Sequence, residues 1–294
     1  MTAIEGIIPA LVTPFTDDEA VDEAALRAHV RRMLAAGAHG VFPGGTNGEF
    51  FAMTGEERQR VLEVVIDEVG GRVPVYAGTG AVTTAETVRL SLAAQEAGAD
   101  VLSVIAPYFA VATQEELYRH FEAVAKAVSI PVLLYNIPAR TGNAIEPATV
   151  ARLAELPTVA GVKDSSGDRD TLLQYIAQTP DDFAVLCGND SLILWALTVG
   201  GAGSITGVAN IVPGTMVGIY ESWKAGDQER AAELQDSIAP IRACFRHGNP
   251  NTIVKAAVNL AGHPVGPCRA PFNVLSDAAV ADITAALDAH TGPR

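Results

Sequence analysis

Short apolar runs rich in β-branched residues alternate along this chain with longer segments of helical periodicity. Parallel strands joined by crossover helices produce this alternation, because both faces of such a sheet are covered. The pattern predicts strands at residues 7–11, 41–43, 73–78, 101–105, 132–135, 159–163, 184–187 and 203–206. Helices are predicted at residues 23–36, 55–69, 84–97, 114–127 and 147–156.

Several of the predicted helices end in an Ala/Gly stretch that turns the chain into the next strand. Eight units of this kind predict an α/β fold, the (β/α)8 or TIM barrel. A doubly wound open sheet is the weaker alternative, because no dinucleotide-binding glycine motif follows the first strand. Further helical patterns follow at 217–224, 228–245 and 252–260. We therefore predict a catalytic barrel region at 1–207 and a C-terminal helical region at 208–294, packed on the barrel.

The composition of the chain limits the binding partners and the cellular compartment that we expect. Hydrophobic residues make up 49% of the chain and charged residues 18%, which indicates a folded, globular protein. A formal net charge of -14 argues against nucleic acid as a partner, and no apolar run is long enough for a membrane span. Cys187, Cys244 and Cys268 are scattered without metal-ligand spacing, so we expect neither a disulfide framework nor a zinc site. We expect a soluble protein of the reducing cytoplasm.

Lys163 ends the predicted strand at 159–163, where barrel enzymes place their catalytic groups. The chain has only four lysines, and we expect the other three, Lys126, Lys224 and Lys255, to lie on helix surfaces. A structural ion pair is the alternative role for Lys163. An apolar strand around the amine favours its neutral form, which is the nucleophile that imine formation requires.

Other strand ends carry polar groups. Tyr135 ends the neighbouring strand and is placed to relay protons, although a strand-end tyrosine can also simply anchor a loop. Arg140 follows it and suits a substrate carboxylate or an ordinary surface salt bridge. After the predicted second strand, a glycine-rich loop at 44–48 carries the donors Thr46 and Asn47, which suit an anion. Gly207 and the glycines at 200–203 resemble a phosphate cradle, but no Lys or Arg is near them in the sequence, which argues against a phosphorylated substrate.

Three motifs in this order resemble the dihydrodipicolinate synthase and N-acetylneuraminate lyase family. They are Gly-Thr-Asn-Gly-Glu at 45–49, Tyr-Asn-Ile-Pro-Ala-Arg-Thr-Gly at 135–142 and Gly-Val-Lys-Asp at 161–164. The likeness extends from residue 4 to about residue 273 and includes the segments at 187–190 and 203–210. It implies a barrel with a C-terminal helical region, a homotetramer, and a pyruvate-dependent aldolase or lyase that needs no metal or organic cofactor.

The same resemblance assigns roles to individual residues. Lys163 corresponds to the lysine that forms a Schiff base with pyruvate, and Tyr135 to the proton-relay tyrosine. Thr46 and Asn47 correspond to the pair that binds the carboxylate of pyruvate, and Arg140 to the arginine that binds the carboxylate of the aldehyde. The remaining candidate substrate-binding residues are Gly45, Ile205 and Tyr108.

Three positions depart from the synthase pattern. Asn47 replaces the second threonine of the carboxylate-binding pair, and Phe109 replaces a tyrosine that in the synthases reaches into the neighbouring subunit's site. The missing hydroxyl argues against synthase activity, whereas Arg140 argues for it. Val82 stands where lysine-inhibited synthases have asparagine, so we expect no feedback inhibition by lysine.

We therefore predict an enzyme that makes or cleaves a C–C bond between pyruvate, or another 2-oxo acid, and an aldehyde. The expected substrate is a 2-keto-3-deoxy sugar acid or a related 4-hydroxy-2-oxo acid. One alternative is 4-hydroxy-tetrahydrodipicolinate synthase, which condenses pyruvate with aspartate semialdehyde. An alternative of another class is a non-catalytic 2-oxo acid binding protein.

Overall fold

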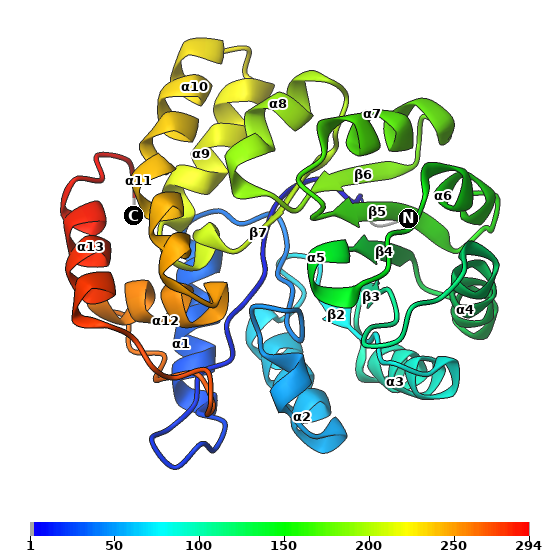
Figure 1. Cartoon of the computed structure of the whole chain (residues 1–294), viewed down its shortest axis with the longest axis horizontal. Helices are drawn as coiled ribbons and strands as arrows, with labels where there is room; N and C mark the ends of the chain where they lie inside the picture. The colour runs from blue at the N-terminus through cyan, green and yellow to red at the C-terminus, as the bar shows by residue number, and fades with distance from the viewer. Residues whose placement is uncertain (1–2, 294) are drawn as a thin grey trace.

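The computed structural model describes residues 3–293, and seven parallel strands form one curled sheet at its centre (Figure 1). The strands follow one another in the order β1-β7-β6-β5-β4-β3-β2. They are β1 (Gly6–Pro9), β2 (Tyr76–Gly78), β3 (Val101–Ile105), β4 (Val132–Asn136), β5 (Val159–Asp164), β6 (Ala184–Cys187) and β7 (Gly203–Thr206). Seven of the eight predicted strands are thus confirmed, with ends that differ by up to three residues.

The predicted strand at 41–43 is not a strand but a pair of isolated bridges. Phe42 pairs with Ala10, just after β1, and Val41 pairs with Val75, just before β2. Pro43 has no N–H to extend a ladder, and Gly44 turns the chain with φ +70°. The segment nevertheless links the two edges of the sheet, because β1 and β2 are its outer strands.

Helices follow the strands around the outside of the sheet (Figure 1). They are α1 (Glu23–Ala35), α2 (Gly55–Val69), α3 (Thr84–Ala97), α4 (Gln114–Ala127), α5 (Pro138–Thr141), α6 (Pro147–Leu153), α7 (Arg169–Gln178) and α8 (Ile193–Thr198). All five helices predicted between strands are present. Thr54 and Thr113 begin α2 and α4 with capping boxes, in which the threonine and a glutamate three residues later satisfy free backbone N–H groups.

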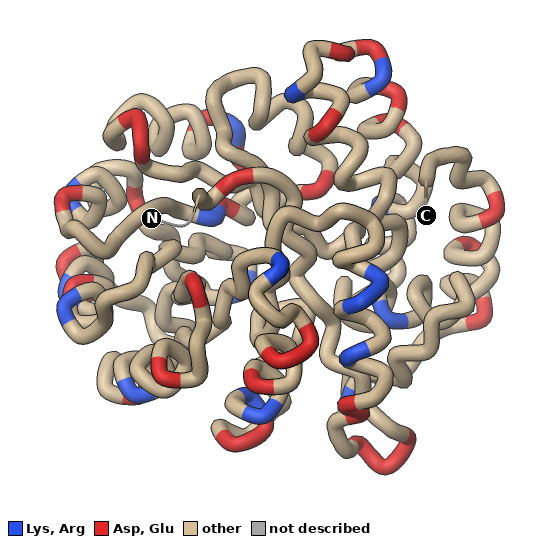
Figure 2. The backbone as a smooth tube through the Cα atoms, turned by 180° about the vertical axis from the view of Figure 1, so that it is seen from behind, with Lys and Arg blue, Asp and Glu red and all other residues tan. Residues whose placement is uncertain are grey.

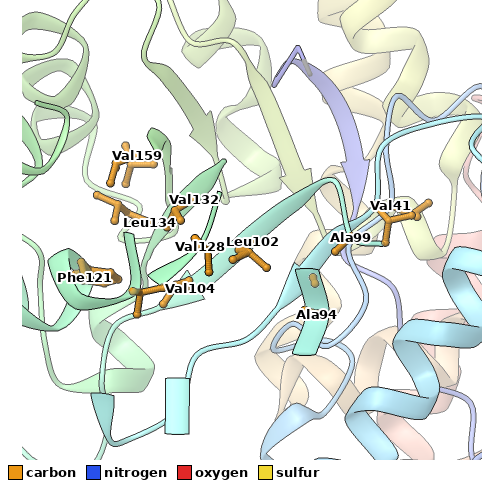
Figure 3. Packing of buried hydrophobic residues seen from close by; sticks show 14 of the residues in the cluster. Val41, Ala94, Ala99, Leu102, Val104, Phe121, Val128, Val132, Leu134 and Val159 are labelled. Atoms are coloured by element: carbon orange, nitrogen blue, oxygen red, sulfur yellow. The ribbon is translucent and has the colours of Figure 1, made fainter. Parts of the chain in front are cut away.

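Alternate residues along each strand pack on opposite faces of the sheet, as the two-residue period of a strand requires. Leu102, Val104 and Leu134 face outward and pack with Phe121 of α4 (Figure 3). Val101 and Leu133 face inward and pack with residues of other strands such as Ile205. The inward positions at the carboxyl ends of β4 and β5 are Tyr135 and Lys163.

Five helices follow β7 and gather on one side of the sheet (Figure 1). They are α9 (Pro213–Lys224), α10 (Gln228–Ser237), α11 (Ala239–Ala243), α12 (Pro250–Leu260) and α13 (Asp277–Asp288). The helix predicted at 228–245 is divided at Ile238, and α13 was not among the predicted segments. Buried residues of these helices, such as Ile219 and Val254, share one apolar cluster with Ile7 of β1. The helices therefore pack directly on the strand region.

Acidic residues are spread over the outer helices and loops, with Lys and Arg between them (Figure 2). Most ion pairs among these residues are exposed pairs such as Arg60 with Glu23 and Arg119 with Glu115. Within residues 3–293, no helix is long and apolar enough to cross a membrane.

Candidate active site

The strand register places Tyr135 beside Lys163. The two residues are direct partners in the β4–β5 ladder, and both line the same cavity. The Lys163 Nζ atom lies 3.9 Å from the centroid of the Tyr135 ring and 5.2 Å from that of Phe42. Lys163 is buried, and no carboxylate among residues 3–293 forms an ion pair with it. The structural ion pair considered for Lys163 from the sequence is therefore absent from the described part of the chain.

The carboxylate next to Lys163 in the sequence is engaged elsewhere. Asp164 accepts hydrogen bonds from Asn136 Nδ2 (2.8 Å) and Ser166 Oγ (2.7 Å). Burial raises the pKa of its carboxyl, and the two hydrogen bonds act against that shift. The Asn136 side chain also accepts from Ile145 N (3.0 Å), which fixes the chain after α5. This network therefore holds the carboxyl ends of β4 and β5 in place.

The glycine-rich loop brings a hydroxyl to the tyrosine. Thr46 Oγ1 lies 3.2 Å from the Tyr135 hydroxyl, and either group is able to donate. The loop is close to β2, where a Cβ atom on Gly78 would lie 2.1 Å from Gly44 O. Only glycine fits at that approach, so the backbone of the loop is held in one position.

Helix α12 supports this loop from the other side. Asn251 Nδ2 donates to Thr46 O (2.6 Å), and Lys255 Nζ lies 2.7 Å from Glu49 Oε1. Glu49 has a left-handed backbone (φ 56°) and also accepts from Arg269 N (3.1 Å). The prediction that Lys255 lies on the surface is wrong, because its amine is buried by this ion pair and by Phe15. The sequence could not show the pair, since its members are far apart along the chain.

A cavity of about 330 Å³ opens beside Lys163 at the carboxyl ends of the strands. Six residues proposed from the sequence line it: Thr46, Asn47, Tyr135, Arg140, Lys163 and Ile205. Two others do not. Gly45 lies close to the Phe42 ring, which a Cβ at this position would approach to 2.7 Å. Tyr108 lines a neighbouring cavity of about 220 Å³ that Thr46 and Arg140 also line.

Arg140 lies in α5, directly after β4, and its side chain is exposed. Within residues 3–293 it has no carboxylate partner, and it lines both cavities. The surface salt bridge that was its alternative role is therefore not formed in the described part of the chain. Phe109 follows Tyr108 with a left-handed backbone (φ 78°) and is 97% exposed, so it does not reach the cavity of its own chain.

Several cavity residues were not proposed as site residues from the sequence. The largest group lies after β6 and in the helices beyond β7: Gly188, Asn189, Asp190, Arg242, Phe245, Pro250 and Asn251. The segment at 187–190 belongs to the family likeness, but its residues carry no chemical pattern of their own. Arg242 and Phe245 gave no signal at all, because they lie in a helical pattern without a special spacing.

A cation does lie in the same cavity as Gly207, contrary to the expectation from the sequence. Gly207 does line the cavity, and the fold brings Arg242 to the same cavity although the two residues are far apart in the sequence. The absence of a cation near Gly207 in the sequence is therefore no argument about the substrate. No group of three His, Cys, Asp or Glu side chains within residues 3–293 is placed to hold a metal ion.

These groups together suit chemistry on a small anionic carbonyl compound. A buried amine without a carboxylate partner is a suitable nucleophile for a carbonyl carbon. A tyrosine in contact with it and hydrogen-bonded to a threonine is placed to move protons. Arg140 and Arg242 add two cations around the amine, which favours substrates that carry acid groups.

Comparison with known proteins identifies the family. The dihydrodipicolinate synthetase family model matches residues 3–290. A 4-hydroxy-tetrahydrodipicolinate synthase of Methanopyrus kandleri is 49% identical over 272 residues, which cover 92% of this chain and 90% of the relative. An uncharacterized DapA-like lyase of Halobacterium salinarum is 43% identical over 97% of this chain and 92% of its own.

Solved structures agree with the sequence relatives. YagE, a prophage protein of the dihydrodipicolinic acid synthase family from Escherichia coli K12, was solved in complex with pyruvate. It superposes with a TM-score of 0.94 at 35% identity, over 97% of both chains. A dihydrodipicolinate synthase structure gives a TM-score of 0.93 at 35% identity, over 97% of this chain and 98% of that one. The resemblance inferred from the three motifs is thus confirmed, and the chain belongs to the dihydrodipicolinate synthetase family, as a lyase of the class I aldolase type.

Proposed function

We propose that this protein is a Schiff-base-forming, pyruvate-dependent aldolase whose imine forms on Lys163. One observation carries the proposal. The Lys163 amine is buried in a cavity, free of carboxylate partners within residues 3–293, and in contact with Tyr135. We also propose that the linked sheet is a (β/α)8 barrel, with residues 41–43 in the place of its second strand. In this reading residues 1–207 form the catalytic region and residues 208–294 a helical region packed on it.

The reaction begins when neutral Lys163 attacks C2 of pyruvate. The carbinolamine loses water to give an iminium ion, which withdraws electrons from C3. A C3 proton then leaves, and the resulting enamine attacks the carbonyl carbon of the aldehyde, whose oxygen takes up a proton. Water hydrolyses the imine and releases a 4-hydroxy-2-oxo acid together with the free amine. The reverse sequence cleaves such an acid, and neither direction requires a change of oxidation state in the protein.

The surrounding side chains have distinct roles in this proposal. Tyr135 transfers protons to and from the reacting groups. Its hydroxyl is also hydrogen-bonded to Thr46, which is able to donate or accept the proton of that bond. Thr46 and Asn47 hold the carboxylate of pyruvate. Ile205 contributes an apolar wall to the cavity. Gly45 contributes only loop backbone, and Tyr108 contributes through the neighbouring cavity.

Borohydride trapping tests the imine. The protein is incubated with pyruvate and sodium borohydride and then analysed by intact mass and peptide mapping. We expect one reduced pyruvyl adduct on Lys163, none in Lys163→Ala, and an unchanged adduct in Lys126→Ala, which removes an exposed lysine. Folded wild-type protein without an adduct would contradict the proposal and favour the non-catalytic binding protein.

Two substrate classes are compatible with this chemistry. The first is a 2-keto-3-deoxy sugar acid or a related 4-hydroxy-2-oxo acid. The second candidate, condensation of pyruvate with aspartate semialdehyde, is favoured by the name of the Methanopyrus kandleri relative and by Arg140. Steady-state turnover of aspartate semialdehyde beside glyceraldehyde, each with pyruvate, separates the two classes. The predicted lack of inhibition by lysine is checked in the same assay.

We also propose that the protein acts as a homotetramer in the cytoplasm. Support for self-association comes from Phe109 and Val111, two neighbouring apolar residues that are 97% and 85% exposed. Light scattering after size-exclusion chromatography measures the assembly. We expect a tetramer for the wild type and a smaller species for Phe109→Ser.

A further inference from the structure

The cavity contains an arginine that the proposed imine chemistry does not use. Arg242 lies in α11, after the last strand, and lines the cavity together with Lys163. The order of the strands fixes its position relative to the other cation. Lys163 is on β5, Arg140 follows β4 on one side, and Arg242 contacts the segment that follows β6 on the other side. The two arginines therefore flank the nucleophile.

Arg242 is held in place but its donors are only weakly used. Its guanidinium lies over the Phe245 ring, 4.5 Å from the centroid, which fixes its plane. Its Nε donates to Ser191 Oγ at 3.3 Å, and its Nη2 donates to Asn189 Oδ1 at 3.4 Å. Both distances are at the outer limit of a hydrogen bond to a guanidinium. A substrate oxygen at an ordinary distance would be a better acceptor for the same N–H groups.

Within residues 3–293, the carboxylate that pairs with Arg242 is that of Asp190, and the pair is a loose one. Asp190 Oδ2 lies 3.5 Å from Arg242 Nη1, and Asp190 Oδ1 already accepts a hydrogen bond from Thr206. The Asp190 side chain is buried, whereas 26% of the Arg242 side chain remains accessible. The accessible part of the pair is thus the cation. Asp190 repels any anion bound to Arg242, and this repulsion is about twice as large for a phosphate dianion as for a single carboxylate.

We propose that Arg242 is a specificity-determining residue, which binds a carboxylate at the far end of the aldehyde that reacts with the Lys163-bound enamine. The substrate class is then a short aldehyde that ends in a carboxylate, and the product is a dicarboxylic 4-hydroxy-2-oxo acid. This inference rests on the proposed function and chooses between its two substrate classes. The resemblance assigns the same carboxylate to Arg140, but the Arg140 side chain is exposed, whereas the Arg242 guanidinium is fixed over the Phe245 ring. It distinguishes acidic aldehydes from the uncharged, hydroxylated aldehydes released by keto-deoxy sugar acids.

The test compares aldehydes that differ only in their far end. Succinate semialdehyde, butanal and an aldehyde ending in a phosphate are each assayed with pyruvate, using wild type, Arg242→Gln and Arg242→Lys. For Arg242→Gln we expect kcat/KM with succinate semialdehyde to fall by about 10- to 100-fold, the effect of losing a charge-assisted hydrogen bond. Turnover of butanal stays within about twofold of wild type. Arg242→Lys recovers part of the loss.

The matched control is Arg246→Gln, which removes an equal charge four residues away. Arg246 is exposed and pairs with Asp282, outside the cavity. We expect it to leave all three kcat/KM values unchanged. Thermal unfolding of each variant shows whether it is folded, and a variant that unfolds is replaced in the comparison by Arg242→Lys.

Three outcomes would overturn the inference. An equal loss of kcat/KM for succinate semialdehyde and butanal in Arg242→Gln would show that Arg242 has a structural role. A larger loss of kcat/KM for the phosphate aldehyde would show that Arg242 binds a phosphate and not a carboxylate. A loss in Arg140→Gln but none in Arg242→Gln would assign the carboxylate to the other arginine. Borohydride trapping of pyruvate on each variant keeps the two proposals apart. If pyruvate is trapped on Lys163 but the kcat/KM values do not depend on the end group of the aldehyde, only the role of Arg242 is refuted. If no adduct forms in the wild type, the proposed function is refuted.

Discussion

The buried ion pair between Lys255 and Glu49 gives the sharpest prediction about stability. The two charged atoms lie 2.7 Å apart, and the side chains are 1% and 0% exposed. Lys255 Nζ also donates to Pro267 O (2.9 Å), and Glu49 also accepts from Arg269 N. Lys255→Met keeps the volume and the apolar stem but leaves the Glu49 carboxylate without its cation.

The size of the effect follows from the burial. Removing one partner of a buried ion pair costs about 3–5 kcal/mol, because the remaining charge is neither hydrated nor paired. Burial also lowers the pKa of Lys255, and the attraction of Glu49 acts against that shift. The double variant Glu49→Gln/Lys255→Met removes both charges. We expect it to lose less free energy of unfolding than Lys255→Met alone.

Urea unfolding at pH 7, followed by circular dichroism, measures the free energy of each variant. Lys126→Met is the control, since Lys126 is an exposed lysine paired with Glu122, and we expect almost no change. Because Glu49 directly follows the loop that carries Thr46, we also expect Lys255→Met to raise KM for pyruvate more than it lowers kcat. Two results would contradict this prediction. One is a loss of less than about 1 kcal/mol in the free energy of unfolding of Lys255→Met, and the other is a double variant that is less stable than Lys255→Met.

Two other predictions concern protons. Tyr135→Phe keeps the ring against Lys163 but removes the hydroxyl that relays protons. We expect kcat to fall by about 100-fold or more, while borohydride still traps pyruvate on Lys163. An unchanged kcat would exclude the relay. Burial lowers the pKa of His29 to about 4, so the folded state keeps it neutral while the unfolded chain takes up a proton below pH 6.5. Stability is then fully present above pH 6.5 and is lost as pH falls toward 4, by about 2 kcal/mol between pH 7 and pH 5. Urea unfolding at these two pH values should show a smaller loss for His29→Gln, and an equal loss in both proteins would contradict the assignment.

The sequence predicted those parts of the site that depend on one strand and its end. Lys163 and Tyr135 lie at the ends of neighbouring strands. They are direct partners in the ladder, so their side chains lie on the same face of the sheet and come into contact. The loop at 44–48 was visible for the same reason, because it directly follows a predicted strand. The error at 41–43 was also local, since Pro43 has no N–H to donate to a ladder and Gly44 turns the chain with φ +70°.

Contacts made by the helices after β7 were beyond the reach of sequence patterns. Lys255 and Arg242 both lie in ordinary helical segments, and their spacing says nothing about which loop they approach. Their positions follow from the packing of α9–α13 against β1, which depends on the whole fold. A periodicity argument assigns a lysine in a helix to the surface by default, and that default fails where a distant glutamate is buried with it.

The contacts that complete the site span most of the chain. Asn251 meets Thr46 across 205 residues, and Arg269 meets Glu49 across 220. A nascent chain emerges in order from its N-terminus, so all seven strands are synthesised well before the residues that hold the glycine-rich loop. Until about residue 269 has left the ribosome, Lys163 and Tyr135 are therefore present without a braced loop beside them. Activity should appear as one of the last events of biosynthesis, after the strand region has already become compact.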